Sequence, residues 1–184
     1  MAESTRHWTW SRIARRIRVP LGFAFAGVYI WLARPAGWSI LLGAGISLLG
    51  VLIRALASGH VRKNEELTTT GPYGYTRNPL YLGSIVIAIG FAIAARSLWI
   101  GIVLVVLFLA IYLPVIRSEE EFLRGKFANF DEYVARVPRL FPRLTSASPE
   151  SGSFSRDLYL QHREYNALIG TVLMIGALTI KLVW

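Results

Sequence analysis

The sequence predicts an all-α membrane protein: a bundle of about five transmembrane helices with an amphipathic helix at the cytoplasmic interface. Apolar residues make up 54% of the 184-residue chain, which is high for a soluble domain. They form long runs, and Lys and Arg lie mostly between those runs. The chain has no cysteine, so disulfides, thiolate nucleophiles and cysteine-ligated metals are excluded. Any catalysis must therefore use oxygen and nitrogen groups or a bound cofactor.

Five near-continuous apolar runs are candidate transmembrane spans. They cover about residues 19–33, 38–57, 79–95, 98–116 and 166–184. The first is short for a hydrocarbon core roughly 30 Å thick, and Arg18 and Arg34 can extend its reach by snorkelling from its ends. The tight connections at 34–37 and 95–97 predict two antiparallel helical hairpins.

Glycines recur in the second and third predicted spans. They are Gly43, Gly45, Gly50, Gly83 and Gly90. Small residues at such spacings permit two helices to approach closely, so we expect these two spans to pack against each other.

Positive charge alternates between the two ends of the predicted bundle. Five arginines precede the first span: Arg6, Arg12, Arg15, Arg16 and Arg18. The positive-inside rule then places the N-terminus and the two long polar segments, about 58–78 and 117–163, on the cytoplasmic side. The net charge of +9 is thus explained by membrane topology rather than by nucleic-acid binding. We expect one membrane domain over residues 1–184, with a flexible Ser/Pro/Gly-rich linker at about 145–155 before the last span.

The segment from Gly71 to Gly83 is the most informative part of the chain. Gly71-Pro72 and Gly74 favour a turn, and Pro79 suits the first turn of a helix. The segment also carries three tyrosines and one cation, namely Tyr73, Tyr75, Tyr81 and Arg77. Two interpretations fit: an interfacial aromatic belt, or a rigid loop that binds a ligand at the membrane surface.

A second polar cluster, Glu119-Glu120-Glu121, follows the fourth span. We expect it to begin an amphipathic helix, with Glu119 and Glu120 on the face of Leu123 and Glu121 turned toward water. One interpretation is that the acidic residues complement the helix macrodipole. The other is that they bind a partner, because a carboxylate near a membrane is costly without one. Candidate partners are Arg117, Arg77, His60, Lys63 and a cationic cofactor.

Together the two clusters resemble the bacterial branch of the isoprenylcysteine carboxyl methyltransferase family, which is related to phospholipid N-methyltransferases. The first half of the family pattern matches Gly71-Pro72-Tyr73 and Arg77-Asn78-Pro79-Leu80-Tyr81-Leu82-Gly83. The second half matches Glu119-Glu120-Glu121-Phe122-Leu123, followed by Tyr133 and Val137-Pro138. The resemblance covers about residues 54–142, and Asn78 stands where many relatives carry His.

The resemblance implies an S-adenosylmethionine-dependent methyltransferase in a bacterial inner membrane, with its active site on the cytoplasmic side. The implied cofactor-binding residues are His60, Tyr73, Asn78, Pro79, Tyr81, Leu82, Gly83, Glu119, Glu120 and Tyr133. The implied catalytic residues, which would orient the acceptor, are Arg77, Arg117 and Arg136. No metal is required, and no nucleic acid or obligate protein partner is expected.

The implied substrate is a lipophilic or lipid-linked molecule that enters from the bilayer, and membrane lipids are the expected surroundings. A carboxyl O-methyltransferase of the isoprenylcysteine type is favoured, because a carboxylate acceptor is already ionised at neutral pH. The alternatives are a phospholipid N-methyltransferase and an NADPH-dependent membrane reductase of the sterol reductase type.

Overall fold

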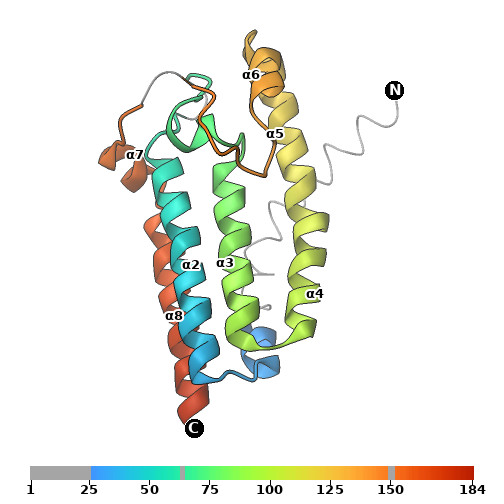
Figure 1. The fold of residues 1–184 in the computed structure, drawn as a ribbon, viewed down its shortest axis with the longest axis vertical. Helices are drawn as coiled ribbons and strands as arrows, with labels where there is room; N and C mark the ends of the chain where they lie inside the picture. Colours follow the sequence, from blue (N-terminus) through green and yellow to red (C-terminus); the bar gives the residue numbers. More distant parts are fainter. Residues whose placement is uncertain (1–25, 63–64, 149–151) are drawn as a thin grey trace.

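The computed structural model describes residues 26–62, 65–148 and 152–184, and this part of the chain contains helices and loops but no strand. Long helices lie side by side and form a bundle (Figure 1). Residues 26–32 are helical. The other long helices are α2 (Gly37–Ser58), α3 (Pro79–Ala95), α4 (Leu98–Leu107), α5 (Leu113–Lys126) and α8 (Tyr165–Val183). The predicted all-α bundle is confirmed.

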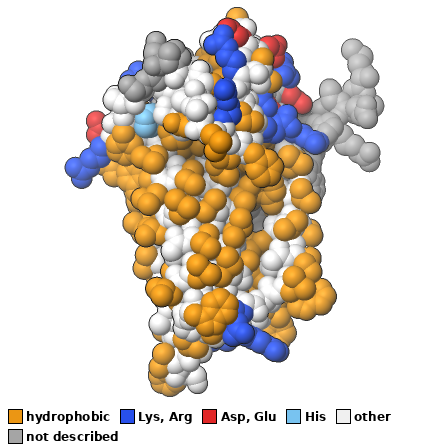
Figure 2. Space-filling model, in the orientation of Figure 1, with side chains coloured by type: hydrophobic (Ala, Val, Ile, Leu, Met, Phe, Trp, Pro, Cys, Tyr) orange, Lys and Arg blue, Asp and Glu red, His pale blue; other side chains and the backbone are white. Residues whose placement is uncertain are grey.

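Among the described residues, three helices are long and apolar enough to cross a membrane. They are α2, the continuous helix Leu98–Lys126 that contains α4 and α5, and α8. Helix α3 is apolar but has only 17 residues. The predicted span at 19–33 lies largely outside the described residues. Figure 2 shows hydrophobic side chains covering the body of the bundle, as expected of a surface in contact with lipid.

The polar segments gather at one end of the bundle. They contain three short helices, η1 (Gly71–Gly74), α6 (Phe130–Arg136) and α7 (Arg156–Gln161). All three lie at the same end in Figure 1, and most of the charged side chains visible in Figure 2 are found there. The two tight connections, at 33–36 and 96–97, lie at the opposite end. The predicted hairpins and the shared side of the two polar segments are therefore confirmed.

The segment predicted as a flexible linker is tied to the polar end at both of its described parts. The amide of Ala147 donates to the carbonyl of Gly74 at 2.9 Å. The amide of Ser155 donates to the carbonyl of Gly59 at 2.8 Å, and the Ser155 hydroxyl caps α7. These bonds hold the approach to α7 against the end of α2.

Helices α2 and α3 meet through glycine, as expected. A Cβ on Gly50 would lie 2.6 Å from the carbonyl oxygen of Gly83, and one on Gly90 would lie 2.5 Å from that of Gly43. Backbone therefore touches backbone along this contact, which requires residues without side chains. Gly45 differs, because a Cβ there would meet nothing within 4 Å.

The acidic cluster does not begin a separate amphipathic helix, and that prediction is wrong. Helix α4 continues through a π-helical segment, Phe108–Tyr112, into α5, so Glu119 to Glu121 lie well inside a helix that ends at Lys126. The π-helical turn precedes Pro114, which has no N–H for the usual helical bond, and the wider turn keeps the helix continuous there. The macrodipole interpretation of the cluster is thereby excluded. The separate short helix is α6, which begins at Phe130.

Candidate functional site

The Gly-Pro-Tyr turn forms the short helix η1, and the ring of His60 packs against Gly71 of this helix. Gly71 has a φ of +56°, and a Cβ on it would lie 2.6 Å from Nε2 of His60. Glycine alone satisfies both the left-handed backbone and the close contact. The two ring nitrogens of His60 face carbonyl oxygens, Nδ1 that of Leu56 at 2.8 Å and Nε2 that of Gly152 at 3.1 Å. His60 thus holds the turn in place.

Asn78 and Pro79 begin α3, as the sequence predicts. Pro79 occupies the first turn, where its missing N–H costs no helical bond. The Asn78 side chain is buried and Nδ2 makes two bonds, to Oε1 of Glu120 at 3.2 Å and to the carbonyl of Arg139 at 2.9 Å. An amide therefore connects the start of α3 to α5 and to the segment after α6.

Glu120 is the centre of this network and is only 6% exposed. Its Oε1 lies 3.4 Å from Nη2 of Arg77 and its Oε2 lies 2.7 Å from Nη2 of Arg139. With the Asn78 amide, the carboxylate has two cationic partners and one neutral donor. A buried carboxylate needs such partners, because it would otherwise carry a large desolvation cost. Glu119 and Glu121 on the same helix are exposed.

A cavity of about 1060 Å³ opens beside this network. It lies between the start of α3, the polar half of α5, helix α6 and residues 61–62 and 66–68. Its wall combines cations, carboxylates and aromatic rings. The residues that carry these groups are Arg62, Arg77, Arg117, Glu66, Glu119, Glu120, Glu121, Tyr73, Tyr81, Tyr133, Phe122 and Phe130.

Nine of the thirteen residues predicted for the site line this one cavity. They are Tyr73, Arg77, Asn78, Pro79, Tyr81, Arg117, Glu119, Glu120 and Tyr133. Three others lie elsewhere: His60 lies under the turn, Gly83 packs against Arg54 and Gly50, and the Leu82 amide bonds to the carbonyl of Asn78. The two separate motifs of the sequence thus converge on one space.

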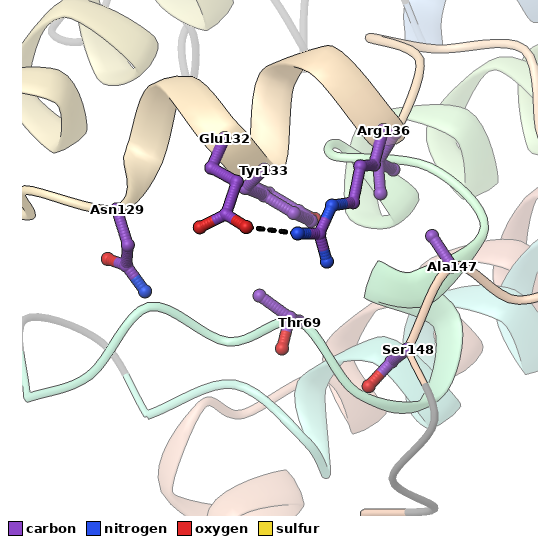
Figure 3. Close-up of a pocket in the computed structure, with 8 residues that line it drawn as sticks. Thr69, Asn129, Glu132, Tyr133, Arg136, Ala147 and Ser148 are labelled. Carbon is purple, nitrogen blue, oxygen red and sulfur yellow. Dashed lines mark hydrogen bonds and ion pairs between the residues drawn. The ribbon is translucent and has the colours of Figure 1, made fainter.

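Arg136 lies at a second, smaller pocket of about 180 Å³ (Figure 3). There its guanidinium pairs with Glu132 one turn earlier in α6. Tyr133 lines both spaces, so α6 separates them. The structure does not bring Arg136 to Arg77 and Arg117.

Burial sets the protonation of the two phenols at the cavity. It raises the pKa of Tyr73 and of Tyr133 well above the ordinary value for tyrosine. The Tyr133 hydroxyl donates to the carbonyl of Tyr73 at 2.7 Å. Both phenols therefore stay neutral at physiological pH and serve as hydrogen-bond donors rather than bases.

Arg77 has an unmet donor. Its side chain is 9% exposed, and its Nε–H is buried without a hydrogen-bond partner among the described residues. Burial lowers the pKa of Arg77 and the nearby Glu120 raises it, and guanidinium stays protonated in either case. Arg77 also lines the cavity, and its buried Nε–H carries a desolvation cost that no hydrogen bond offsets.

Arg139 also joins this network, a contact that the sequence motifs did not predict. It binds Glu120 through Nε at 2.9 Å, and its own carbonyl accepts from Asn78 and from the hydroxyl of Thr76. Arg139 follows directly after Val137-Pro138, which ends the matched pattern. This position in the sequence could have indicated that Arg139 lies near the site. The backbone adds to the same contact, since the Arg77 amide donates to the carbonyl of Pro138 at 3.0 Å.

Comparison with known proteins agrees with this geometry. Residues 49–129 match the family model described as phospholipid methyltransferase, a stretch that contains the Gly-Pro-Tyr turn, α3 and the acidic part of α5. This segment is similar to the phospholipid methyltransferase family. The resemblance to isoprenylcysteine and phospholipid methyltransferases is confirmed at this level. Arg139, in contrast, lies beyond the matched segment.

Two relatives are similar over most of the chain. The nickel-cobalt-cadmium resistance protein NccN of Alcaligenes xylosoxydans xylosoxydans is 40% identical over 125 residues, covering 64% of this chain and 58% of that protein. The cobalt-zinc-cadmium resistance protein CzcN of Cupriavidus metallidurans is 38% identical over 125 residues, covering 64% and 57%. The chain therefore spans less than two thirds of the length of these relatives. No solved structure matches it.

Proposed function

We propose that this protein is an S-adenosylmethionine-dependent membrane methyltransferase that methylates a carboxylate on a lipophilic acceptor. The observation that carries the proposal is the cavity at the polar end of the bundle, whose wall holds the buried Arg77 with an unmet donor. The phospholipid methyltransferase segment supports the reaction class. A volume of about 1060 Å³ is large for a ligand pocket, for which about 300–1,000 Å³ is typical, and leaves room for cofactor and acceptor headgroup together.

The residues of the wall fit the proposed cofactor. S-adenosylmethionine carries a flat base, a ribose, an amino group, a carboxylate and a sulfonium, and when bound it supplies an electrophilic methyl group. Tyr73, Tyr81 and Tyr133 offer aromatic surface. Glu119 and Glu121 offer acceptors for amino and hydroxyl groups, and Arg77 and Arg117 offer cations for carboxylates.

Glu120 has a different role from the one its sequence position implied. Both of its oxygens already engage Arg77, Asn78 and Arg139, so it holds those side chains toward the cavity. We therefore assign direct contact with the cofactor to Glu119, and the positioning of Arg77 and Asn78 to Glu120. Orientation of the reacting groups is the main contribution that a protein makes to such an in-line displacement.

The acceptor is assigned from the proton chemistry of the wall. No His or Lys is present among the described residues that line the cavity, and the two buried phenols stay protonated. An ammonium acceptor would have to lose a proton first, whereas a carboxylate is ionised at neutral pH and needs no base. Arg77 and Arg117 orient that carboxylate, and its charge is neutralised as the ester forms.

Binding of radiolabelled S-adenosylmethionine to the purified protein in detergent tests the cofactor, with NADPH as the comparison. We expect saturable binding of S-adenosylmethionine and none of NADPH. Failure of folded protein to bind S-adenosylmethionine would sink the proposal. Binding of NADPH alone would favour the reductase alternative.

Transfer of the labelled methyl group identifies the acceptor class. The protein is incubated with a prenylcysteine analogue bearing a free carboxylate, with its methyl ester as the control, and with vesicles of phosphatidylethanolamine. We expect base-labile label on the free acid alone. Base-stable label on phosphatidylethanolamine would instead identify a phospholipid N-methyltransferase.

A further inference from the structure

A second ion pair, partly buried, lies outside the cavity and joins three helices. Arg54 of α2 and Glu164 at the start of α8 face each other with side-chain exposures of 22% and 11%. Nε and Nη2 of Arg54 both donate to the Glu164 carboxylate, at 2.9 Å and 2.7 Å, in a two-pronged contact. Paired planar contacts of this kind fix geometry as well as charge.

The third nitrogen of Arg54 reaches the first turn of α3. Nη1 donates to the carbonyl of Leu80 at 3.2 Å and to the hydroxyl of Ser84 at 2.5 Å. Room for this contact comes from Gly83, where a Cβ would lie 2.6 Å from Cγ of Arg54. Leu80 lines the cavity, as do Asn78, Pro79 and Tyr81 of the same turn. The guanidinium thus connects α8 to the wall of the cavity.

The conformation of the turn between α7 and α8 directs the Glu164 side chain toward Arg54. Arg163 has a φ of +54°, a left-handed conformation that costs free energy for a residue with a side chain. His162 in the same turn lies with Nδ1 3.1 Å from the carbonyl of Ser58, at the end of α2. Two neighbouring side chains of this turn therefore contact α2 independently, which places the Glu164 carboxylate opposite Arg54.

We propose that Glu164 is a positioning residue for the cavity: by holding Arg54 it fixes the first turn of α3, which carries Asn78, Pro79 and Tyr81. The effect on ligand binding rests on the proposed function, whereas the effect on the turn does not. Without the carboxylate, Arg54 is a partly buried cation that has lost its charged partner, and we expect it to move toward another partner or toward water. Its bonds to Leu80 and Ser84 are then lost.

Hydrogen–deuterium exchange of the full-length protein in detergent tests the positioning without any ligand. Glu164→Gln is expected to speed exchange about 10-fold in the peptide covering residues 78–84, while residues 91–95 at the far end of α3 keep the wild-type rate. Asp131→Asn is the matched control, because it breaks an ion pair with Arg124 that is largely exposed. Wild-type exchange at 78–84 in Glu164→Gln would overturn the proposal.

A double variant with the two charges exchanged distinguishes two roles of the ion pair: positioning the first turn of α3, or only joining α2 to α8. In Arg54→Glu combined with Glu164→Arg, opposite charges again join α2 and α8, but a carboxylate at position 54 cannot donate to the Leu80 carbonyl. We expect this double variant to recover most of the melting temperature lost in Glu164→Gln, yet to keep the fast exchange at 78–84. Recovery of both properties would show that the pair acts only as a link.

Binding of labelled S-adenosylmethionine completes the test. Glu164→Gln is expected to raise the Kd about 10-fold, and Ser84→Ala, which leaves the ion pair intact, to raise it less and to speed the same exchange. If Glu164→Gln cannot be purified in a folded form, exchange at 78–84 in Ser84→Ala tests the contact between Arg54 and α3 instead. If the wild-type protein binds no S-adenosylmethionine, the proposed function fails and the exchange data still decide the positioning role.

Discussion

At the scale of single residues, the Glu120 carboxylate determines how the cavity wall is arranged. It is almost fully buried and joins α5 to Arg77 and Asn78 at the start of α3 and to Arg139 after α6. The partners come from two segments that are far apart in the sequence, so the carboxylate joins three parts of the chain. Removing its charge leaves Arg77 buried beside a neutral amide.

Glu120→Gln is expected to lower the free energy of unfolding by about 3 kcal/mol, because it breaks a buried ion pair by removing one partner. Binding of labelled S-adenosylmethionine should weaken as well. Thermal melting in detergent and equilibrium binding measure the two effects. Glu132→Gln, which alters an exposed pair on α6, is the control, and equal behaviour of the two variants would contradict the assignment.

The buried phenols predict an alkaline instability. Burial raises the pKa of Tyr73 and Tyr133 above the value of about 10 that a tyrosine has in the unfolded chain. Above pH 10 the unfolded chain loses these protons while the folded protein retains them, so stability falls as the pH rises. Melting temperatures between pH 8 and pH 11 measure this loss. Tyr133→Phe should reduce the slope and cost about 1 kcal/mol at neutral pH, since the bond to the Tyr73 carbonyl is lost. An unchanged slope in that variant would show that Tyr133 does not contribute.

The residues that sequence reasoning located best are those with a local conformational cause. Pro79 begins a helix and Gly71 forms a turn for reasons contained in the residues themselves. The contact between Arg139 and Glu120 was not predicted, because it depends on the path that the chain takes after α6. The difference between the buried Glu120 and the exposed Glu119 likewise depends on the rotation of α5, which hydropathy does not determine.

At the scale of elements, the contact between α2 and α3 fixes the position of α3, whose first turn forms part of the cavity wall. Glycines at four positions allow the two backbones to touch, and Arg54 passes beside Gly83 to reach Leu80. The sequence predicted this packing from glycine spacing alone. It did not predict that α4 and α5 form one continuous helix, because an apolar run and a charged run look like two elements when Pro114 lies near their junction.

Gly50→Ala is expected to destabilise the protein by about 2 kcal/mol, because the added methyl would lie 2.6 Å from the Gly83 carbonyl oxygen. Gly45→Ala in the same helix is the matched control. A Cβ there meets nothing within 4 Å, and alanine raises helix propensity by up to about 1 kcal/mol. Thermal melting in detergent compares them. The close contact would be disproved if both variants melted alike.

At the scale of the whole molecule, most of the visible charged side chains lie at one end of an apolar bundle (Figure 2). The cavity, the acidic part of α5 and both polar segments lie at that end, whereas the short connections at 33–36 and 96–97 lie at the other. The side of the membrane on which this polar end lies follows from the charge pattern alone. We expect it to be cytoplasmic.

The absence of cysteine makes this orientation directly measurable. Leu144→Cys places a thiol at a fully exposed position of the polar end, and Leu98→Cys places one at the opposite end, where that residue is 79% exposed. In intact spheroplasts a membrane-impermeant maleimide should label only the variant at position 98, and in inverted vesicles only the one at 144. The reverse pattern would place the cavity outside the cytoplasm.

The glycine contact between α2 and α3 also restricts the routes by which a lipid-borne molecule reaches the cavity. A single added methyl group on Gly50 or Gly90 would already collide with the facing backbone, and an acyl chain is at least as wide as a methyl group. This seam is therefore sealed against the bilayer. A lateral entrance should therefore be sought on the opposite side of α3. There Tyr112, which stacks on Phe108, contacts Tyr81 beside the cavity.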